Sequence, residues 1–256
     1  MGRPEARMER VAMTCAVGIY PMLAFDLATP ANLAFLQPSP GLCFHRVKAT
    51  DRRSEFLFPA IESLLEESGT SMSGLRSIGV GRGPGSFTGV RNAVMAAKAL
   101  AFALEIPLYA PSTLDALAWG AGGSGLVATL IDARRGEVYA CVYRRWEEGL
   151  TRLTPPEVLS PETARERIKS AALSFPGDAL AVVGTGAHAY PETFSTLGDM
   201  LEDPFPSPGG LLSACLEESR LRGSVDPLGL QPLYIRRPDA ECGRPWGPEY
   251  SAGNEG

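Results

Sequence analysis

Short apolar runs alternate along the chain with longer stretches of helical periodicity. In the first half, these runs predict a meander of three strands at 22–27, 32–36 and 42–48. A helix is predicted from about 54 to 67, with Ser54 as its N-cap and Gly69 as its stop. An apolar run ending at Val80 predicts one more strand, and an alanine-rich helix follows it and ends near Leu104.

The second half repeats this order of elements weakly. Its pattern predicts a hairpin of strands 126–132 and 138–143, a helix at 161–172, a strand at 179–183 and a helix at 211–221. Strands followed by a helix, a strand and a helix favour a mixed sheet with helices on its faces. The pattern alone therefore predicts an α/β protein, and the internal echo is consistent with a duplicated domain.

The most unusual segment is a glycine-rich turn between a strand and a helix. It reads Gly79-Val80-Gly81-Arg82-Gly83-Pro84-Gly85-Ser86-Phe87-Thr88-Gly89-Val90-Arg91. Its spacing fits neither a P-loop, nor a Gly-x-Gly-x-x-Gly fingerprint, nor a Gly-x-Ser-x-Gly nucleophile elbow. Two interpretations stay open: a structural turn that lets strand and helix pack closely, or an anion contact made by the hydroxyls of Ser86 and Thr88.

The two helices of the first half are more apolar than ordinary surface helices. A surface helix usually buries an apolar stripe somewhat over about 100° wide. Between residues 90 and 104 the bulky side chains form two arcs, Val90, Val94, Leu100 and Leu104 on one and Met95 and Phe102 on the other. The first arc is expected to cover the sheet. The second is covered either by the other half of this chain or by another protein.

Candidate catalytic groups are sparse. Asp26 ends the first strand and Asp132 the equivalent strand of the second half, where carboxylates could serve a nucleotide or a metal ion, or could simply cap turns. The two histidines, His45 and His188, do not form a His-x-x-x-His pair, which excludes a two-histidine site on one helix. We predict no metal site and no cofactor.

Composition narrows the function classes. The formal net charge of the 256-residue chain is −5, which is unfavourable for binding RNA without a partner. Five scattered cysteines without a Cys-x-x-Cys pair are typical of reduced thiols in a cytoplasmic protein.

No apolar run reaches the roughly 18–20 residues that a membrane-spanning helix needs. We expect disorder in the arginine-containing residues 1–21 and in the tail 238–256, which is rich in proline and glycine.

The glycine-rich motif, with the Ala-Ala-Lys-Ala-Leu-Ala that follows it, closely resembles the TsaB family of bacterial tRNA threonylcarbamoyladenosine biosynthesis proteins. The resemblance runs from about Met22 to Arg237 and includes Ser54-Glu55-Phe56-Leu57-Phe58-Pro59-Ala60-Ile61, Asp132-Ala133-Arg134-Arg135-Gly136-Glu137-Val138-Tyr139 and Pro232-Leu233-Tyr234-Ile235-Arg236. Two departures stand out. The family usually has Asp-Thr-Ser where this chain has Asp26-Leu27-Ala28, and His-Ser-Glu where it has Arg53-Ser54-Glu55.

The resemblance implies two ribonuclease-H-like lobes of the actin-like ATPase superfamily, which we place at 22–110 and 111–237. It implies a non-catalytic subunit that binds and activates TsaD, the catalytic paralogue, with the ATPase TsaE as third partner and tRNA bound only through the complex. A homodimer is expected when the chain is alone. The partner-binding residues implied are Ser54, Glu55, Leu57, Phe58, Ile61, Leu65, Arg91, Met95, Lys98 and Phe102.

A different class of function stays open. An independent ATPase or sugar-kinase-like enzyme of the same superfamily would use Asp26, Ser86 and Thr88 for nucleotide or anion contacts. The loss of hydroxyls after Asp26 removes groups that could touch phosphate, so it disfavours that alternative.

Overall fold

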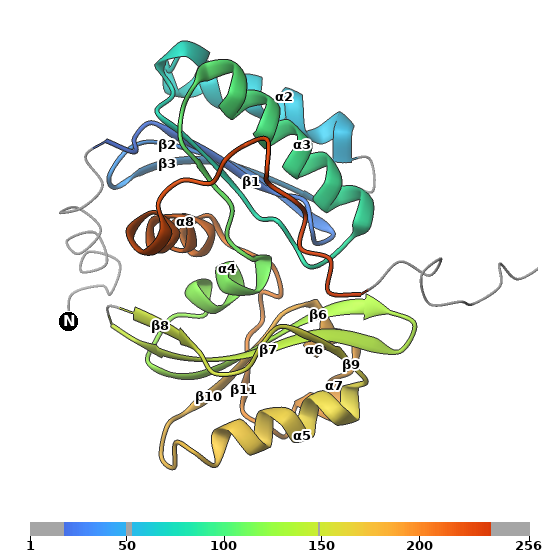
Figure 1. The fold of residues 1–256 in the computed structure, drawn as a ribbon. Helices are drawn as coiled ribbons and strands as arrows, with labels where there is room; N and C mark the ends of the chain where they lie inside the picture. The colour runs from blue at the N-terminus through green and yellow to red at the C-terminus, as the bar shows by residue number, and fades with distance from the viewer. Residues whose placement is uncertain (1–17, 50–52, 148, 237–256) are drawn as a thin grey trace, which may run out of the picture.

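A computed structural model describes residues 18–49, 53–147 and 149–236, and over these ranges the chain forms two mixed sheets flanked by helices. In Figure 1 the two sheets lie in separate layers, with helices α4 and α8 between them. This confirms the predicted fold of two ribonuclease-H-like lobes.

The first sheet has the strand order β3-β2-β1-β4-β5. Its strands are β1 (Met22–Asp26), β2 (Ala31–Ser39), β3 (Leu42–Ala49), β4 (Ser77–Val80) and β5 (Leu108–Tyr109). The meander β1-β2-β3 is antiparallel, while β4 and β5 run parallel to β1. The three strands predicted from 22 to 48 are confirmed. The second and third are joined at Gly41, whose φ of 81° suits glycine.

Side-chain alternation along β1 directs residues into two cores. Leu23 and Phe25 pack with helices α2 (Arg53–Ser68) and α3 (Phe87–Leu104) on the outer face of the sheet. Met22 and Ala24 pack on the inner face, in a cluster that includes residues of α8 (Pro208–Arg222). A short 3₁₀ helix, η1 (Met72–Gly74), connects α2 to β4.

The second sheet has the order β11-β10-β6-β7-β8, with β9 also paired to β7. Its strands are β6 (Gly125–Arg134), β7 (Glu137–Trp146), β8 (Gly149–Arg152), β9 (Glu157–Leu159), β10 (Leu180–Val183) and β11 (Asp199–Met200). Its helices are α4 (Thr113–Gly120), α5 (Pro161–Ala172), α6 (Thr185–Ala189) and α7 (Pro191–Phe194). Because β6 pairs antiparallel with β7 and parallel with β10, this sheet repeats the pattern of β1, β2 and β4.

The chain returns to the first sheet after it has built the second. Helix α8 packs on β1, β2, β4 and β5, although its residues follow the second sheet in sequence. Residues 223–236 then run across α3 and end beside the second sheet (Figure 1). The lobe boundary at 110/111 therefore stays a prediction, because the chain crosses between the lobes more than once.

The predicted disorder of residues 1–21 is wrong for its last four positions. The backbone of Pro21 accepts a hydrogen bond from Arg76 N at 2.8 Å, and the carbonyl of Ile19 accepts one from Ser77 Oγ at 2.7 Å. The remainder of that prediction, and the predicted flexible tail, lie outside the residues that the structure describes.

Candidate functional site

The glycine-rich turn lies in close contact with strand β1, helix α8 and the backbone at Ala28. A Cβ on Gly79 would be 2.8 Å from both Ala24 Cβ and Cys215 Sγ. A Cβ on Gly85, whose φ is 155°, would be 2.3 Å from the carbonyl oxygen of Ala28. Contacts this short cannot accommodate a side chain, so the glycines satisfy a packing requirement. The geometry favours the structural interpretation of this turn.

The hydroxyl of Ser86 is engaged within the turn. Ser86 is the N-cap of α3, and its Oγ accepts a hydrogen bond from Gly89 N at 3.4 Å. Thr88, in the first turn of the same helix, is exposed. An anion contact by these two residues stays a prediction.

Asp26 is not available to a nucleotide. Its side chain is 1% exposed, and its carboxylate accepts hydrogen bonds from Ala28 N and Thr113 Oγ1, both at 2.7 Å. Burial raises the pKa of this carboxyl, although the two hydrogen bonds lower it in part. The alternative in which Asp26 contacts a nucleotide is disfavoured by this structure, because the backbone of Ala28 and the hydroxyl of Thr113 on α4 occupy its carboxylate.

Helix α3 has the two faces that the sequence predicts. Val90 and Val94 are 2% and 1% exposed and face the sheet, and Leu100 and Leu104 pack at the edge of the same core. On the opposite side, Met95 and Phe102 are 60% and 62% exposed. The described residues of the second half of the chain therefore leave this arc exposed, and covering by that half was one of the two alternatives.

Helix α2 corrects part of the predicted partner-binding set. Leu57 and Ile61 are 2% and 1% exposed, because with Ala60 and Leu64 they form the i, i+3, i+4, i+7 stripe that packs on the sheet. Both were predicted as partner-binding residues, and that assignment is wrong since they lie inside the core. Phe58, by contrast, is 54% exposed.

Three further residues of α2 were predicted to bind a partner. Ser54 lies in the first turn of the helix, and Glu55 is exposed. Leu65 is half-buried against the core. Their contact with a partner stays a prediction.

The two predicted basic residues of α3 differ in their surroundings. The guanidinium of Arg91 is exposed and lies 5.4 Å from the ring centroid of Phe87. Lys98 is half-buried, and its Nζ donates to the carbonyl oxygens of Leu228 and Leu230 at 3.2 and 3.0 Å. Lys98 is thus engaged within its own chain.

Sequence reasoning missed three exposed apolar residues beside this face. Phe87 (57% exposed) was left out because the helix was considered only from Val90 onward. Tyr234, which is 46% exposed, stacks on Phe87 with ring centroids 5.4 Å apart. Leu228 is 69% exposed. No periodicity could have found the last two, because they lie in an irregular segment after α8.

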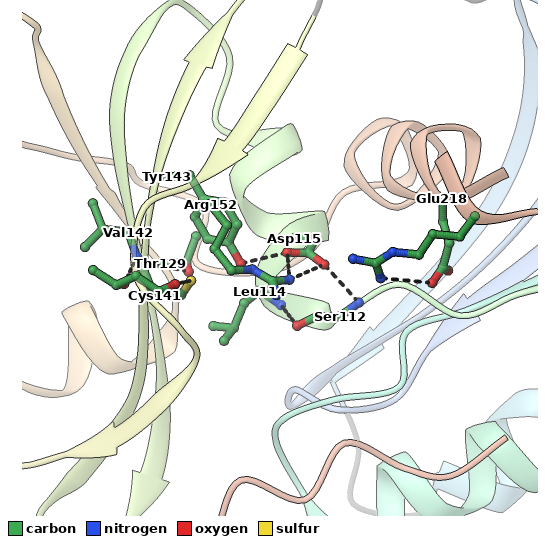
Figure 2. A network of polar contacts seen from close by, with 11 residues as sticks. Ser112, Leu114, Asp115, Thr129, Cys141, Val142, Tyr143, Arg152 and Glu218 are labelled. Carbon is green, nitrogen blue, oxygen red and sulfur yellow. Dashed lines mark hydrogen bonds and ion pairs between the residues drawn. The ribbon is translucent and has the colours of Figure 1, made fainter. Parts of the chain in front are cut away.

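A polar network fills the space between the inner helices and the second sheet (Figure 2). The carboxylate of Asp115 accepts hydrogen bonds from Tyr143 Oη at 2.8 Å and from Arg152 at 2.6 and 2.9 Å. Asp115 also closes a capping box with Ser112 at the start of α4. Burial alone would lower the pKa of Arg152, but the charge of Asp115 raises it overall.

The same region contains a cavity of about 200 Å³. Its charged lining is Arg82, Asp115, Arg152, Glu217, Glu218 and Arg222. Glu218 is 8% exposed, and burial raises its pKa although it accepts a hydrogen bond from Ala110 N at 2.7 Å. Because Asp115 of α4 bonds to Tyr143 of β7 and Arg152 of β8, and Glu218 of α8 accepts from the backbone just after β5, we assign these contacts a structural role.

Within the described residues, no group of three or more His, Cys, Asp or Glu side chains is arranged to hold a metal ion. No helix in that part of the chain is long and apolar enough to cross a bilayer.

The fold and the exposed helical face define a two-lobed ribonuclease-H-like protein in which the described residues leave Met95 and Phe102 of the outer helix α3 exposed. Residues 46–229 match the family model of TsaD, tRNA N6-adenosine threonylcarbamoyltransferase. The tRNA threonylcarbamoyladenosine biosynthesis protein TsaB of Escherichia coli is 36% identical over 84% of this chain and 94% of its own length. The chain belongs to the TsaB family.

Two further comparisons agree with the assignment to the TsaB family. The TsaB protein of Bacillus subtilis is 43% identical over 53% of this chain and 60% of its own length. The structure of YeaZ from Pseudomonas aeruginosa superposes with a TM-score of 0.74 at 31% identity, and covers 84% of this chain and 99% of that one.

Proposed function

We propose that this chain is a non-catalytic subunit that binds and activates TsaD, in transfer of a threonylcarbamoyl group to the adenosine adjacent to the anticodon of tRNA. The observation that carries the proposal is the uncovered face of α2 and α3, on which Phe58, Phe87, Met95 and Phe102 are each more than half exposed. Covering Met95 and Phe102 would contribute roughly 1–2 kcal/mol each. Exposed apolar side chains gathered on one face are typical of a protein interaction site.

The charges on this face support a partner of related fold. The exposed acids lie on α2, at Glu55, Glu62, Glu66 and Glu67, whereas α3 has no acidic residue and carries Arg91 and Lys98. Two related chains can therefore place the acidic helix of each beside the basic helix of the other around an approximate two-fold axis. The match of this chain to the TsaD family model supports TsaD as that relative. A second copy of this chain meets the same requirement and would give a homodimer when TsaD is absent.

The remaining partners follow from the same assignment. The net charge of −5 supports tRNA contact through the complex rather than by this chain alone. TsaE, an ATPase, is the third partner in this proposal, and the cytoplasm is the compartment in which the tRNA and these proteins meet.

The test is the double substitution Met95→Glu with Phe102→Glu. We expect it to abolish co-elution with the cognate TsaD and to remove stimulation of threonylcarbamoyl transfer, because two charges would be desolvated at the interface. Leu173→Glu is the matched control, since Leu173 is 82% exposed at the end of α5 in the other lobe. Unchanged binding and unchanged stimulation by the double variant would overturn the proposal.

The alternative, an independent ATPase or kinase, makes a different prediction. ATP with Mg²⁺ would then raise the melting temperature of the isolated chain, by binding the native state only. The enclosure of Asp26 counts against that outcome.

A further inference from the structure

The segment after α8 forms a strap across α3, which we define as residues 225–236. Its first residue donates from Val225 N to the carbonyl of Leu108, at 2.9 Å. Further on, Leu233 N donates to the carbonyl of Arg82 at 2.8 Å, and Arg236 pairs with Glu137 of β7. Figure 1 shows the strap, in red, crossing α3 on its way to the hairpin of β6 and β7.

Lys98 holds the middle of the strap. Its ammonium group donates to two strap carbonyls, Leu228 at 3.2 Å and Leu230 at 3.0 Å. The side chain of Leu230 is 5% exposed and belongs to the core of the first lobe. Since Met95 and Phe102 lie three residues before and four residues after Lys98, the strap is fixed directly beside the exposed apolar arc of α3.

The strap adds apolar surface to this arc. Leu228 is 69% exposed, although its carbonyl is held by Lys98. Tyr234 is 46% exposed, while its ring stacks on Phe87 at the start of α3. An ordered backbone that keeps large apolar side chains outside its own core is costly unless something else covers them.

We propose that the strap is part of the surface that binds TsaD, with Leu228 and Tyr234 as contacts and Lys98 as a positioning residue. This inference rests on the proposed function and extends it, because the partner then contacts α2, α3 and the strap together. The face of α3 carries basic charge only, and Asp226 of the strap is occupied in accepting from Leu228 N and Gly229 N. The complementary partner surface is therefore apolar with acidic groups facing Arg91.

The experiment measures the dissociation constant of the full-length chain with the cognate TsaD by calorimetry. We expect Leu228→Ser combined with Tyr234→Ser to raise Kd at least about tenfold. Lys98→Met keeps most of the side-chain volume and removes the donor, and should raise Kd several-fold. Lys98→Arg should restore binding, since a guanidinium can donate to the same two carbonyls.

Two comparisons make the outcome decisive. Leu173→Ser replaces a leucine of the other lobe that is 82% exposed, and should leave Kd unchanged. If the Met95→Glu, Phe102→Glu variant loses binding while the strap variants stay within twofold of the original Kd, the strap inference is overturned and the proposed function stands. If the strap variants weaken binding and the helical variant does not, the strap is an interaction site and the assignment of the α3 face is wrong. If none weakens binding, both are wrong.

Discussion

Gly81 lies against the carboxylate of Asp26, so closely that a Cβ at position 81 would be 1.8 Å from Asp26 Oδ2. Asp26 ends β1, and Gly81 follows β4, the neighbouring parallel strand. The glycine-rich turn thus encloses the carboxylate of Asp26. The glycine at position 81 and the burial of Asp26 have one geometric cause.

This contact predicts a large effect of adding one methyl group. Gly81→Ala should destabilise the chain by about 1–3 kcal/mol, because Asp26 is buried and its carboxylate is fixed by Ala28 N and Thr113 Oγ1. Gly209→Ala in α8 is the matched control, since a Cβ there meets nothing within 4 Å. Chemical denaturation of both variants checks the prediction, which is wrong if the two stabilities agree within about 0.5 kcal/mol.

Adjacent residues of α2 should separate stability from binding. Leu57→Ala should cost about 2–4 kcal/mol of unfolding free energy, because Leu57 is 2% exposed in the core. Phe58→Ala should change stability by no more than about 0.5 kcal/mol, since Phe58 is 54% exposed, and should instead weaken binding to TsaD. Thermal melting and a binding titration on each variant test this pair. Equal loss of stability in both would contradict the two-faced helix.

The polar network gives a further test. Tyr143→Phe removes the hydrogen bond to Asp115 while keeping the ring, and should cost about 1–2 kcal/mol because the acceptor is charged. Arg144→Met breaks the pair with Asp178 at the protein surface and should cost less than about 1 kcal/mol. Urea unfolding of the two variants gives both values. A smaller cost for Tyr143→Phe than for Arg144→Met would refute the structural role of the network.

Much of the fold could be predicted because local pattern and packing agree. The hairpin around Arg134, Arg135 and Gly136 was expected from its sequence, and all three residues have positive φ in the structure. Helix α4 was missed, since its apolar side chains are buried on several sides and leave no amphipathic stripe. The two-residue strands β5 and β11 carry too little sequence for any pattern to reveal them.

The candidate site could be predicted only in part. The width of the apolar face of α3 predicted a second arc at Met95 and Phe102 that the first sheet does not cover. It left open whether the other half of the chain covers that arc, and the structure shows Met95 60% exposed. Periodicity could not tell that Leu57 faces inward and Phe58 outward, because both lie within one wide apolar arc. The engagement of Lys98 by the strap is a contact across 130 and 132 residues, and no local pattern encodes it.

The last prediction concerns the pH dependence of stability. Burial raises the pKa of Asp26 above its value in the unfolded chain, so the native state holds the proton more tightly. The contribution of Asp26 to stability is therefore fully present below the unfolded pKa of about 3.9 and declines as the pH rises through the folded pKa.

Asp26→Asn removes this dependence, so the melting temperature of the original chain minus that of the variant should fall as the pH rises from about 4 toward 7. A difference for Asp26→Asn that grows with pH would mean that the hydrogen bonds from Ala28 and Thr113 outweigh burial and lower the pKa of Asp26 in the native state.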